Sequence, residues 1–202
     1  MADPVIFVVD DDEDVRESMR VLLEASGFAA EAFDSAGSFL DSGWESRTGA
    51  LLADIRMPDM DGLTLQEELA RRKATLPVII MTGHADVPLA VRAMKAGAID
   101  FLEKPVDDSI LVDSIRRALD AAKATIDAVA ETQEASSRIA ALTDRERKVM
   151  ELMAAGRPNK IIAYELDISP RTVEIHRARV MEKMHAKSLA ELVRMVVAAQ
   201  AR

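Results

Sequence analysis

The fold is decided by the stretch Val5-Ile6-Phe7-Val8-Val9-Asp10-Asp11-Asp12, in which an apolar run ends in consecutive carboxylates. Asp54 stands in the same way at the end of Ala50-Leu51-Leu52-Ala53, and Lys104-Pro105 follows the run 98–102. Runs of this kind are typical of buried parallel strands, and the chemistry of open α/β sheets lies outside the carboxyl ends of those strands. We therefore expect three carboxylates and one ammonium in one crevice. Hard oxygen ligands at that density suit Mg²⁺ and a phosphate oxygen, which makes phosphoryl transfer the simplest chemistry there.

Strand-like and helix-like segments alternate through the first 107 residues and make five βα units. Crossovers of this length require right-handed parallel connections, so the pattern predicts a doubly wound five-stranded parallel sheet with helices on both faces. The expected strands are 5–9, 28–33, 50–54, 77–81 and 98–102, and the expected helices are 13–26, 35–42, 62–73, 86–96 and one that begins at 107.

The helix that begins at 107 has no evident end, because residues 107–137 contain neither Gly nor Pro. Five apolar positions recur there at the spacing of a two-stranded helical seam. A dimerising helix and a solvated, partly helical linker are both compatible with this pattern. The five positions are Ile115, Leu119, Ala122, Ile126 and Val129.

The chain after Leu142 is predicted to be all helix, in four segments at 144–155, 159–166, 170–184 and 188–199. Thr143 with Glu146 forms a capping-box signature, and Ser169-Pro170 supplies an N-cap followed by proline at the first helical position. The break at 166–168 separates two short helices, the second of which is basic. This arrangement is typical of a helix-turn-helix whose second helix enters the major groove, although generic helical bundles share it.

Charge divides the 202 residues in two. Lys plus Arg against Asp plus Glu is 13 against 27 in residues 1–137 and 13 against 8 in residues 138–202, which gives −14 and +5 and sums to −9. A basic second part favours nucleic acid as its partner. The chain has no Cys, no signal-peptide pattern at its start and no apolar stretch long enough to cross a membrane, so we expect a cytoplasmic protein.

Asp54 is the expected nucleophile, because a carboxylate can attack a phosphoryl group once a divalent cation screens the repulsion between the anions. A strand-end capping role is the alternative for Asp54 alone, but Asp10 and Asp11 as a converging metal shell favour catalysis. Thr82 ends another strand at the same edge, where it could bond a phosphoryl oxygen or serve only in packing. Lys104 supplies a point charge for the phosphoryl group, and Pro105 after it suggests a tight turn that aims the ammonium inward.

Taken together, these motifs resemble a bacterial response-regulator receiver domain. They comprise Asp10-Asp11, Asp54, Arg56-Met57-Pro58-Asp59-Met60-Asp61-Gly62, Thr82-Gly83, Lys95-Ala96-Gly97-Ala98 and Lys104-Pro105. The resemblance implies a flavodoxin-like sheet of order 2-1-3-4-5, and Asp54 as the acceptor of a phosphoryl group from a sensor histidine kinase. It implies that Asp11, Asp54 and the Arg56 carbonyl bind Mg²⁺, with Asp10 acting through water. Thr82 and Phe101 would form a switch pair, and Arg56 and His84 would tune the phosphoryl lifetime.

Residues 143–200 resemble the helix-turn-helix of the LuxR class, and the whole chain resembles the FixJ-type regulators of α-proteobacterial two-component systems. The resembling segments include Leu142–Arg147, Asn159-Lys160, Ile162-Ala163 and Ile168–Val173. We expect a receiver domain at 1–122, a helical linker at 123–140 that continues the last receiver helix, and a small all-α four-helix DNA-binding domain at 141–202.

Within the second domain, basic and hydroxyl side chains are expected to contact DNA phosphates, and three outward positions of the recognition helix are expected to reach base edges. The phosphate set is Lys160, Arg171, Thr172, Arg177 and Arg179, and the base set is Glu174, Ile175 and Ala178. Glu174 would accept from a cytosine amine, and Ile175 would touch a thymine methyl. For His176 a structural hydrogen bond and a DNA contact both remain open.

These expectations describe a transcription factor and not an enzyme. The resemblance implies a phosphorylation-dependent homodimer that binds promoter DNA, works with RNA polymerase and activates transcription, with nitrogen-fixation or low-oxygen genes as targets. The sequence itself leaves activation and repression open. One alternative is a Mg²⁺-dependent phosphatase with an aspartyl intermediate, which would need an acid where Arg56 stands. The other is a phosphate sink whose basic end binds protein.

Overall fold

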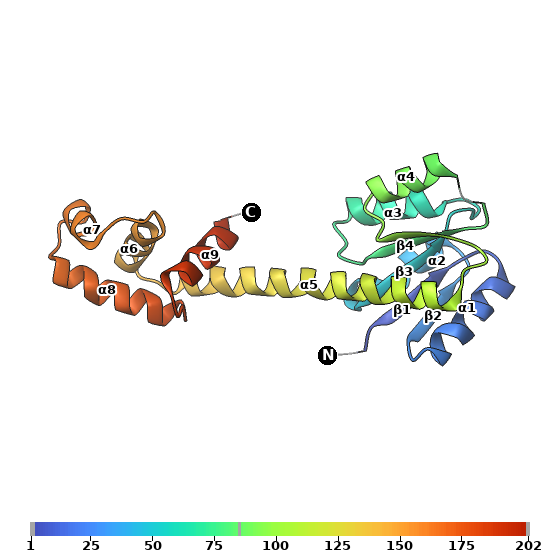
Figure 1. Cartoon of the computed structure of the whole chain (residues 1–202), viewed down its shortest axis with the longest axis horizontal. Helices are drawn as coiled ribbons and strands as arrows, with labels where there is room; N and C mark the ends of the chain where they lie inside the picture. Colours follow the sequence, from blue (N-terminus) through green and yellow to red (C-terminus); the bar gives the residue numbers. More distant parts are fainter. Residues whose placement is uncertain (1–2, 85, 201–202) are drawn as a thin grey trace. The chain divides into compact units, whose positions relative to one another are not determined.

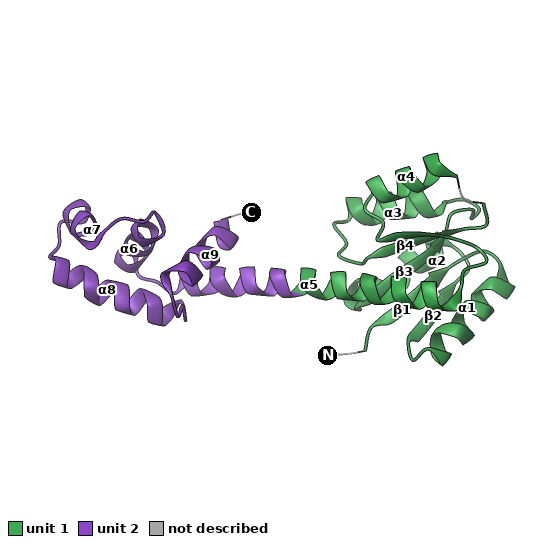
Figure 2. Cartoon of the chain, in the orientation of Figure 1, with its two compact units in different colours: residues 1–126 green, residues 127–202 purple. Residues whose placement is uncertain are grey.

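The computed structural model describes residues 3–84 and 86–200. These residues form two compact units, 1–126 and 127–202, coloured separately in Figure 2. The division lies inside the segment 123–140 that the sequence predicts as a linker. Each unit has its own hydrophobic core.

The first unit is built on a five-stranded sheet of order β2-β1-β3-β4-β5 in which every pairing is parallel, as the sequence predicts (Figure 1). The three inner strands are buried almost throughout because they carry continuous apolar runs. The strands are β1 (Val5–Val9), β2 (Ala29–Phe33), β3 (Gly49–Asp54), β4 (Val78–Thr82) and β5 (Asp100–Glu103).

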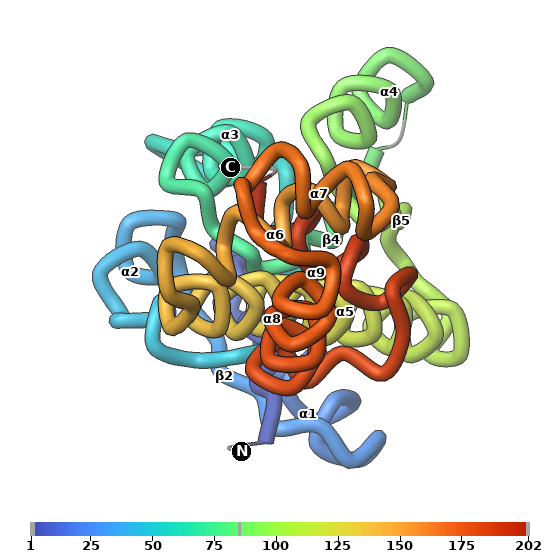
Figure 3. Tube along the Cα trace, turned by 90° about the vertical axis from the view of Figure 1, so that its left-hand side faces the viewer, coloured from blue at the N-terminus to red at the C-terminus, as the bar shows by residue number. Residues whose placement is uncertain are grey.

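Helices cover both faces of this sheet, and alternate strand residues pack against each layer. Phe7 and Ile80 belong to a cluster with the helices of one face, whereas Val8 and Ile79 belong to a cluster with those of the other. Figures 1 and 3 show α1 on the opposite side of the strands from α3 and α4. The first cluster uses α2 (Ala36–Leu40), α3 (Gly62–Arg71) and α4 (Val87–Lys95), and the second uses α1 (Glu13–Ala25) and the start of α5 (Asp108–Ala140).

An aromatic group closes the first cluster near the amino-terminal edge of β3. Trp44, in the short helix η1 (Trp44–Ser46), is buried and stacks on Phe39 with ring centroids 5.7 Å apart. Gly49, which opens β3, approaches β1 so closely that a Cβ there would lie 1.8 Å from the carbonyl oxygen of Val5. Only glycine allows β1 and β3 to pair in this register.

The helix α5 runs without a break from Asp108 to Ala140. The predicted seam, however, does not lie on one free face. Ile115 is fully buried in the core of the first unit, whereas Ile126 and Val129 are 41% and 46% exposed. Ile115 therefore belongs to the core and not to an exposed seam, because a heptad pattern and the apolar face of an ordinary amphipathic helix have nearly the same period.

The second unit contains four further helices around a core that includes Val149, Ile162, Val173 and Val180. The last turns of α5 belong to this unit too, since Ala135 is buried and the Arg138 guanidinium donates to the carbonyl oxygen of Met184 at 3.0 Å. The helices are α6 (Asp144–Ala154), α7 (Asn159–Glu165), α8 (Pro170–Lys183) and α9 (Leu189–Gln200). No helix of the described residues is long and apolar enough to cross a membrane.

The start of α6 is fixed by Glu146, which completes the predicted capping box with Thr143. The Glu146 carboxylate is buried, accepts from the Thr143 backbone nitrogen at 2.9 Å and pairs with Lys183 Nζ at 2.7 Å. The hydrogen bond from Lys183, followed by that from Thr143, lowers the pKa of Glu146 to about 2. Glu146 therefore joins α6 to the last turn of α8.

We expect this carboxylate to make the second unit acid-sensitive. Because its folded pKa lies below its usual value near 4.5, its contribution to stability is complete above pH 4.5 and is lost as the pH falls toward 2. Glu146→Gln should lower the free energy of unfolding at neutral pH by about 1–2 kcal/mol and flatten this acid limb. Amide exchange in α6 between pH 6 and pH 3 measures both effects. Glu151→Gln, on the exposed side of the same helix, is the control; an equal effect in both variants would contradict the assignment.

Candidate active site and nucleic-acid interface

Three of the predicted site side chains meet at the carboxyl edge of the sheet. Lys104 Nζ lies 2.5 Å from Asp10 Oδ2 and 2.5 Å from Asp54 Oδ1. Asp10 follows β1, Asp54 ends β3 and Lys104 follows β5, so parallel strands bring together residues that are far apart in the sequence. Asp10 and Asp54 are only 1% and 6% exposed. The ammonium thus bridges two buried carboxylates.

Backbone groups fix each of these side chains. The Arg56 nitrogen donates to Asp54 Oδ2 at 2.6 Å, and the Asp12 nitrogen donates to Asp10 Oδ1 at 3.0 Å. The Lys104 nitrogen donates to the Thr82 carbonyl oxygen at 2.7 Å, and the peptide bond between Lys104 and Pro105 is cis. Asp12 itself caps α1, as its position before the helix predicts. The carboxylates are therefore oriented before any ligand arrives.

Burial and pairing act in opposite directions on the charges of the crevice. Burial raises the pKa of Asp10, and the hydrogen bond from Lys104 opposes that rise without cancelling it. For Lys104, burial alone would lower the pKa, but hydrogen bonds to Asp10 and Asp54 outweigh it and raise the pKa. The Lys104 ammonium therefore stays charged, which is the state needed to hold an anion between two carboxylates.

The crevice also has the donors that a hard divalent cation requires. Asp11 is exposed beside the buried Asp10, and the Arg56 backbone lies two residues after Asp54. Within residues 3–84 and 86–200, no three acidic or histidine side chains already converge as a metal cage. Carboxylate and carbonyl oxygens in an open crevice fit Mg²⁺, which keeps several waters and needs few protein ligands.

Thr82 is completely buried at the end of β4, next to Lys104. Its hydroxyl donates to the His84 carbonyl oxygen and accepts from the His84 nitrogen, both at 3.2 Å. It is thus engaged with its own loop in this structure. Phe101 lies opposite Ile80 in the β4–β5 register and packs, partly exposed, against the core. The exposed His84 bounds the same loop.

Gly62 is a positioning residue whose role the sequence does not reveal. It begins α3, and a Cβ on it would lie 2.2 Å from the Asp54 carbonyl oxygen. Its backbone nitrogen donates to the Ile55 carbonyl oxygen at 3.1 Å. The first turn of α3 therefore rests directly on the backbone that carries Asp54. The glycine after Asp61 in the sequence signals a turn, but only the fold reveals this close approach.

The predicted recognition helix is α8, and the turn before it lies where the sequence places it. Asp167 adopts a positive φ of 51°, and the Arg145 guanidinium donates to the Leu166 carbonyl oxygen in this turn. Val173 and Val180 face the core. Most of the predicted contact residues are exposed, with Arg177 and Thr172 half-buried. The exposed ones are Lys160, Arg171, Glu174, Ile175, Ala178 and Arg179.

Spacing places the base-contact set on one stripe of α8. Glu174, Ile175 and Ala178 follow one another by one and three positions, which aligns them on one side of the helix, and Arg171 of the phosphate set lies three positions before Glu174 on the same side. The Thr172 hydroxyl, expected to contact a DNA phosphate, is hydrogen-bonded within the protein, because it lies 2.8 Å from Ser169 Oγ at the N-cap of α8. For His176, Nδ1 is buried and has no hydrogen-bond partner in the described part of the chain. The structural hydrogen bond considered for His176 is thus absent at this nitrogen.

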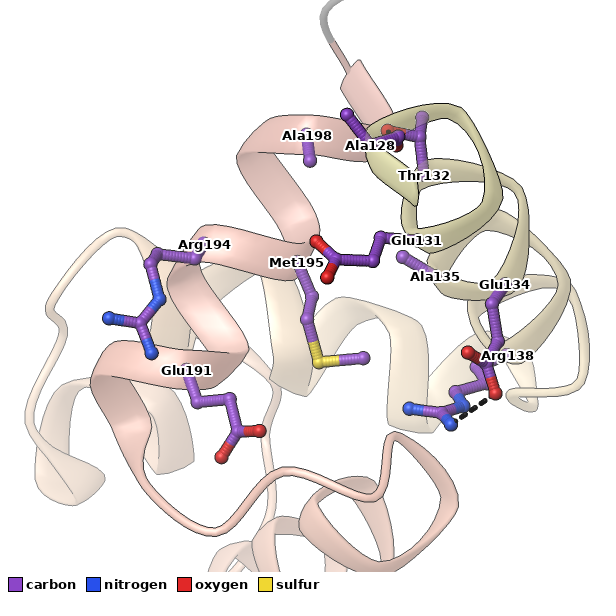
Figure 4. Close-up of a pocket in the computed structure, with 10 residues that line it drawn as sticks. All are labelled: Ala128, Glu131, Thr132, Glu134, Ala135, Arg138, Glu191, Arg194, Met195 and Ala198. Atoms are coloured by element: carbon purple, nitrogen blue, oxygen red, sulfur yellow. Dashed lines mark hydrogen bonds and ion pairs between the residues drawn. The ribbon is translucent and has the colours of Figure 1, made fainter. Parts of the chain in front are cut away.

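A groove of about 540 Å³ lies elsewhere in the second unit, between the end of α5 and α9 (Figure 4). Glu131 and Met195 lie in its middle, and Glu134 pairs with Arg138 at its edge, 2.5 Å apart. It contains none of the residues predicted to bind DNA. The groove is part of the packing between two helices of this unit.

Two family descriptions match the chain. Residues 6–116 match the response regulator receiver domain, and residues 140–196 match the bacterial regulatory proteins of the luxR family. The transcriptional regulatory protein FixJ of Rhizobium meliloti (strain 1021) is 49% identical over 201 residues, which is 98% of this chain and 97% of that protein. The chain belongs to the FixJ-type response regulators.

Solved structures agree with this assignment. The response regulator StyR has a TM-score of 0.82 at 42% identity, with 97% of this chain and 99% of that chain covered. Full-length FixJ from B. japonicum has a TM-score of 0.61 at 46% identity, with all of both chains covered.

Regulators of this type act in transcription and are not enzymes, and their receiver domains imply a histidine kinase as partner and generally bind Mg²⁺. The luxR-family match favours DNA over protein as the partner of the basic end.

Proposed function

We propose that this response regulator accepts a phosphoryl group on Asp54 from a sensor histidine kinase and then binds promoter DNA as a homodimer. The observation that carries the proposal is the bridge from Lys104 to the buried carboxylates of Asp10 and Asp54. Asp54 offers a nucleophilic oxygen at the edge of the sheet, and Lys104 offers a cation that can move from the carboxylates to an incoming phosphoryl oxygen.

Asp11, Asp54 and the Arg56 carbonyl oxygen would hold Mg²⁺ in this crevice, with Asp10 bound through water. When bound, the cation screens the repulsion between the Asp54 carboxylate and an anionic phosphoryl group. Thr82 would release the His84 backbone and bond the phosphoryl group, and Phe101 would turn inward to fill the space. Arg56 and His84 border the path of attacking water and would set the lifetime of the phosphoryl group.

We propose α4 and β5 as the dimerising surface of the phosphorylated receiver. Val91 and Met94 on α4 are exposed apolar residues, and Lys95 beside them is exposed too. Exposed apolar side chains grouped on one helix are typical of an interaction site. A dimer would present two recognition helices to half-sites about one helical turn apart. Without phosphorylation, the linker or the receiver would mask them.

Sedimentation of the full chain with Mg²⁺, with and without a small phosphoryl donor, tests this function. We expect a monomer that becomes a dimer when the donor is added and that then binds promoter DNA. A chain that takes up the phosphoryl group yet remains monomeric would overturn the dimer mechanism. A chain that dimerises but binds no DNA would favour the phosphate-sink alternative.

We further propose that the regulator acts in the cytoplasm with RNA polymerase as an activator, on nitrogen-fixation or low-oxygen genes. Similarity to FixJ along the whole chain supports this choice. Transcript levels after deletion, compared at high and low oxygen, test the gene class and the direction of regulation. Target genes that rise on deletion would indicate repression.

Two substitutions in α8 should separate base recognition from phosphate binding. Glu174→Ala is expected to relax base preference at one position of the site by about 1–3 kcal/mol. Arg171→Ala should weaken binding to all sequences and reduce the slope of log K against log salt by about 1. Fluorescence anisotropy with operator variants at several salt concentrations measures both. Glu182→Ala, exposed at the far end of the same helix, is the control. If Glu182→Ala alters base preference as Glu174→Ala does, the assignment is wrong.

A further inference from the structure

The helix α4 is held to the rest of the receiver by few buried groups. Ala93 is the buried residue of this helix, whereas Val87, Val91 and Met94 are exposed. Leu89 is partly buried against the core, but a helix with so few buried apolar groups gains little from apolar burial, so individual polar contacts weigh more in fixing its position.

One buried side chain from another helix reaches the carboxyl end of α4. Gln66 of α3 is buried, and its Nε2 donates to the Ala93 carbonyl oxygen at 3.2 Å. The same carbonyl accepts from the Ala98 nitrogen at 3.1 Å, beyond Gly97 with its positive φ of 94°. Gln66 thus completes the carboxyl-terminal cap of α4 from outside the helix.

The helix that carries Gln66 also rests on the phosphorylation loop. Gly62, one turn before Gln66, leaves no room for a side chain against the Asp54 carbonyl oxygen and bonds to Ile55. A shift of the backbone at Asp54 must therefore displace the first turn of α3 or break this contact. A rigid helix passes such a displacement along its axis. The next buried polar contact of α3 after Gly62 is the hydrogen bond from Gln66 Nε2 to the Ala93 carbonyl oxygen.

The Gln66 amide is only half satisfied. Its Oε1 is buried and has no hydrogen-bond partner among the residues that the structure describes. A buried amide with one unpaired acceptor is favoured to rearrange when a donor comes within reach. The present contact is accordingly a weak clamp, suited to a helix that changes position.

We propose that Gln66 is a positioning residue for α4: its amide holds the carboxyl end of that helix in the unphosphorylated arrangement and couples it, through α3 and Gly62, to Asp54. Phosphorylation would move α3, weaken the bond to Ala93 and free α4 to adopt its dimerising position. This inference rests on the proposed function in its choice of α4 as the dimerising surface. The coupling is carried by buried contacts and is separate from the Thr82 hydroxyl.

The chain supplies a matched control between the same two helices. Glu67 of α3 faces Arg92 of α4 at 3.9 Å, and the two side chains are 64% and 66% exposed. An exposed pair of this kind contributes little. Gln66→Met removes the buried donor at nearly constant volume, whereas Glu67→Ala removes only the exposed pair.

Hydrogen exchange and sedimentation of the full chain test the proposal. In Gln66→Met, protection of the last α4 amides should fall by about two- to tenfold, which is the range for one neutral hydrogen bond. The ratio of dimer dissociation constants without and with phosphoryl donor should fall by a similar factor, while the rate of phosphorylation changes by less than twofold. Glu67→Ala should match the unaltered chain in all three measurements.

Unchanged α4 protection or an unchanged donor-dependent ratio in Gln66→Met would overturn the proposal, and so would equal effects in Glu67→Ala. If Gln66→Met does not fold, the side-chain amide resonance of Gln66 in the unaltered chain gives the answer. It should shift when the donor is added, and a resonance that stays fixed would overturn the proposal. If the unaltered chain does not dimerise with donor, the proposed function fails, and exchange in α4 still tests the clamp.

Discussion

Asp54→Asn is expected to abolish phosphoryl uptake and, with it, every donor-dependent change in the protein. The amide has the shape of the carboxylate but lacks the nucleophilic oxygen, and Lys104 keeps Asp10 as its partner. The free energy of unfolding should therefore change by only about 1 kcal/mol. Phosphoprotein gels give the loss of uptake, and sedimentation with donor and Mg²⁺ gives the loss of the dimer.

The control for this substitution is Asp59→Asn. Asp59 is exposed, lies five residues after Asp54 and adopts a positive φ of 65°, which asparagine tolerates. It should behave as the unaltered chain. If phosphoryl uptake survives in Asp54→Asn and disappears in Asp59→Asn, the acceptor is Asp59 and the assignment of Asp54 is wrong.

Gly62→Ala is expected to lower the stability of the receiver and to slow its phosphorylation, more than a methyl group added at an exposed position would. The added Cβ would lie 2.2 Å from the Asp54 carbonyl oxygen and 3.0 Å from its carbon, and backbone atoms cannot swing aside as side chains do. Overpacking of this kind costs about 1–3 kcal/mol or more, and here it also displaces the nucleophile. We expect a lower midpoint of urea unfolding together with slower phosphorylation.

Gly37→Ala is the matched control, because it introduces the same methyl group inside α2 with nothing within 4 Å of the new atom. In a helix this change should be neutral or stabilising by about 0.5–1 kcal/mol. If Gly62→Ala unfolds at the same urea concentration as Gly37→Ala, the close contact between the start of α3 and the Asp54 backbone is contradicted.

The crevice can be predicted from the sequence because the carboxyl ends of parallel strands lie together at one edge of the sheet. Asp10 and Lys104 are 94 positions apart, yet each follows an apolar run, and runs of this kind end at one edge of the sheet. The stripe on α8 is predictable for a similar reason, since helix periodicity alone sorts buried Val173 from exposed Glu174.

What the sequence does not reveal depends on contacts between elements. Nothing near Gln66 in the chain indicates that its amide reaches α4, and Gly62 resembles any glycine of a turn until α3 is placed against Asp54. Ile115 belongs to the core, although the spacing of its apolar neighbours fits a helical seam equally well. The division of the chain into 1–122, 123–140 and 141–202 remains a prediction that proteolysis would test.

The buried position of Trp44 has a practical consequence. It is the one tryptophan of the chain, packed on Phe39 within the first unit, while the one tyrosine, Tyr164, is 86% exposed in the second unit. Emission excited at the red edge of tryptophan absorption therefore reports the environment of the first unit only. The protein carries an intrinsic optical reporter of one of its two units, which allows the unfolding of that unit to be followed without any added label.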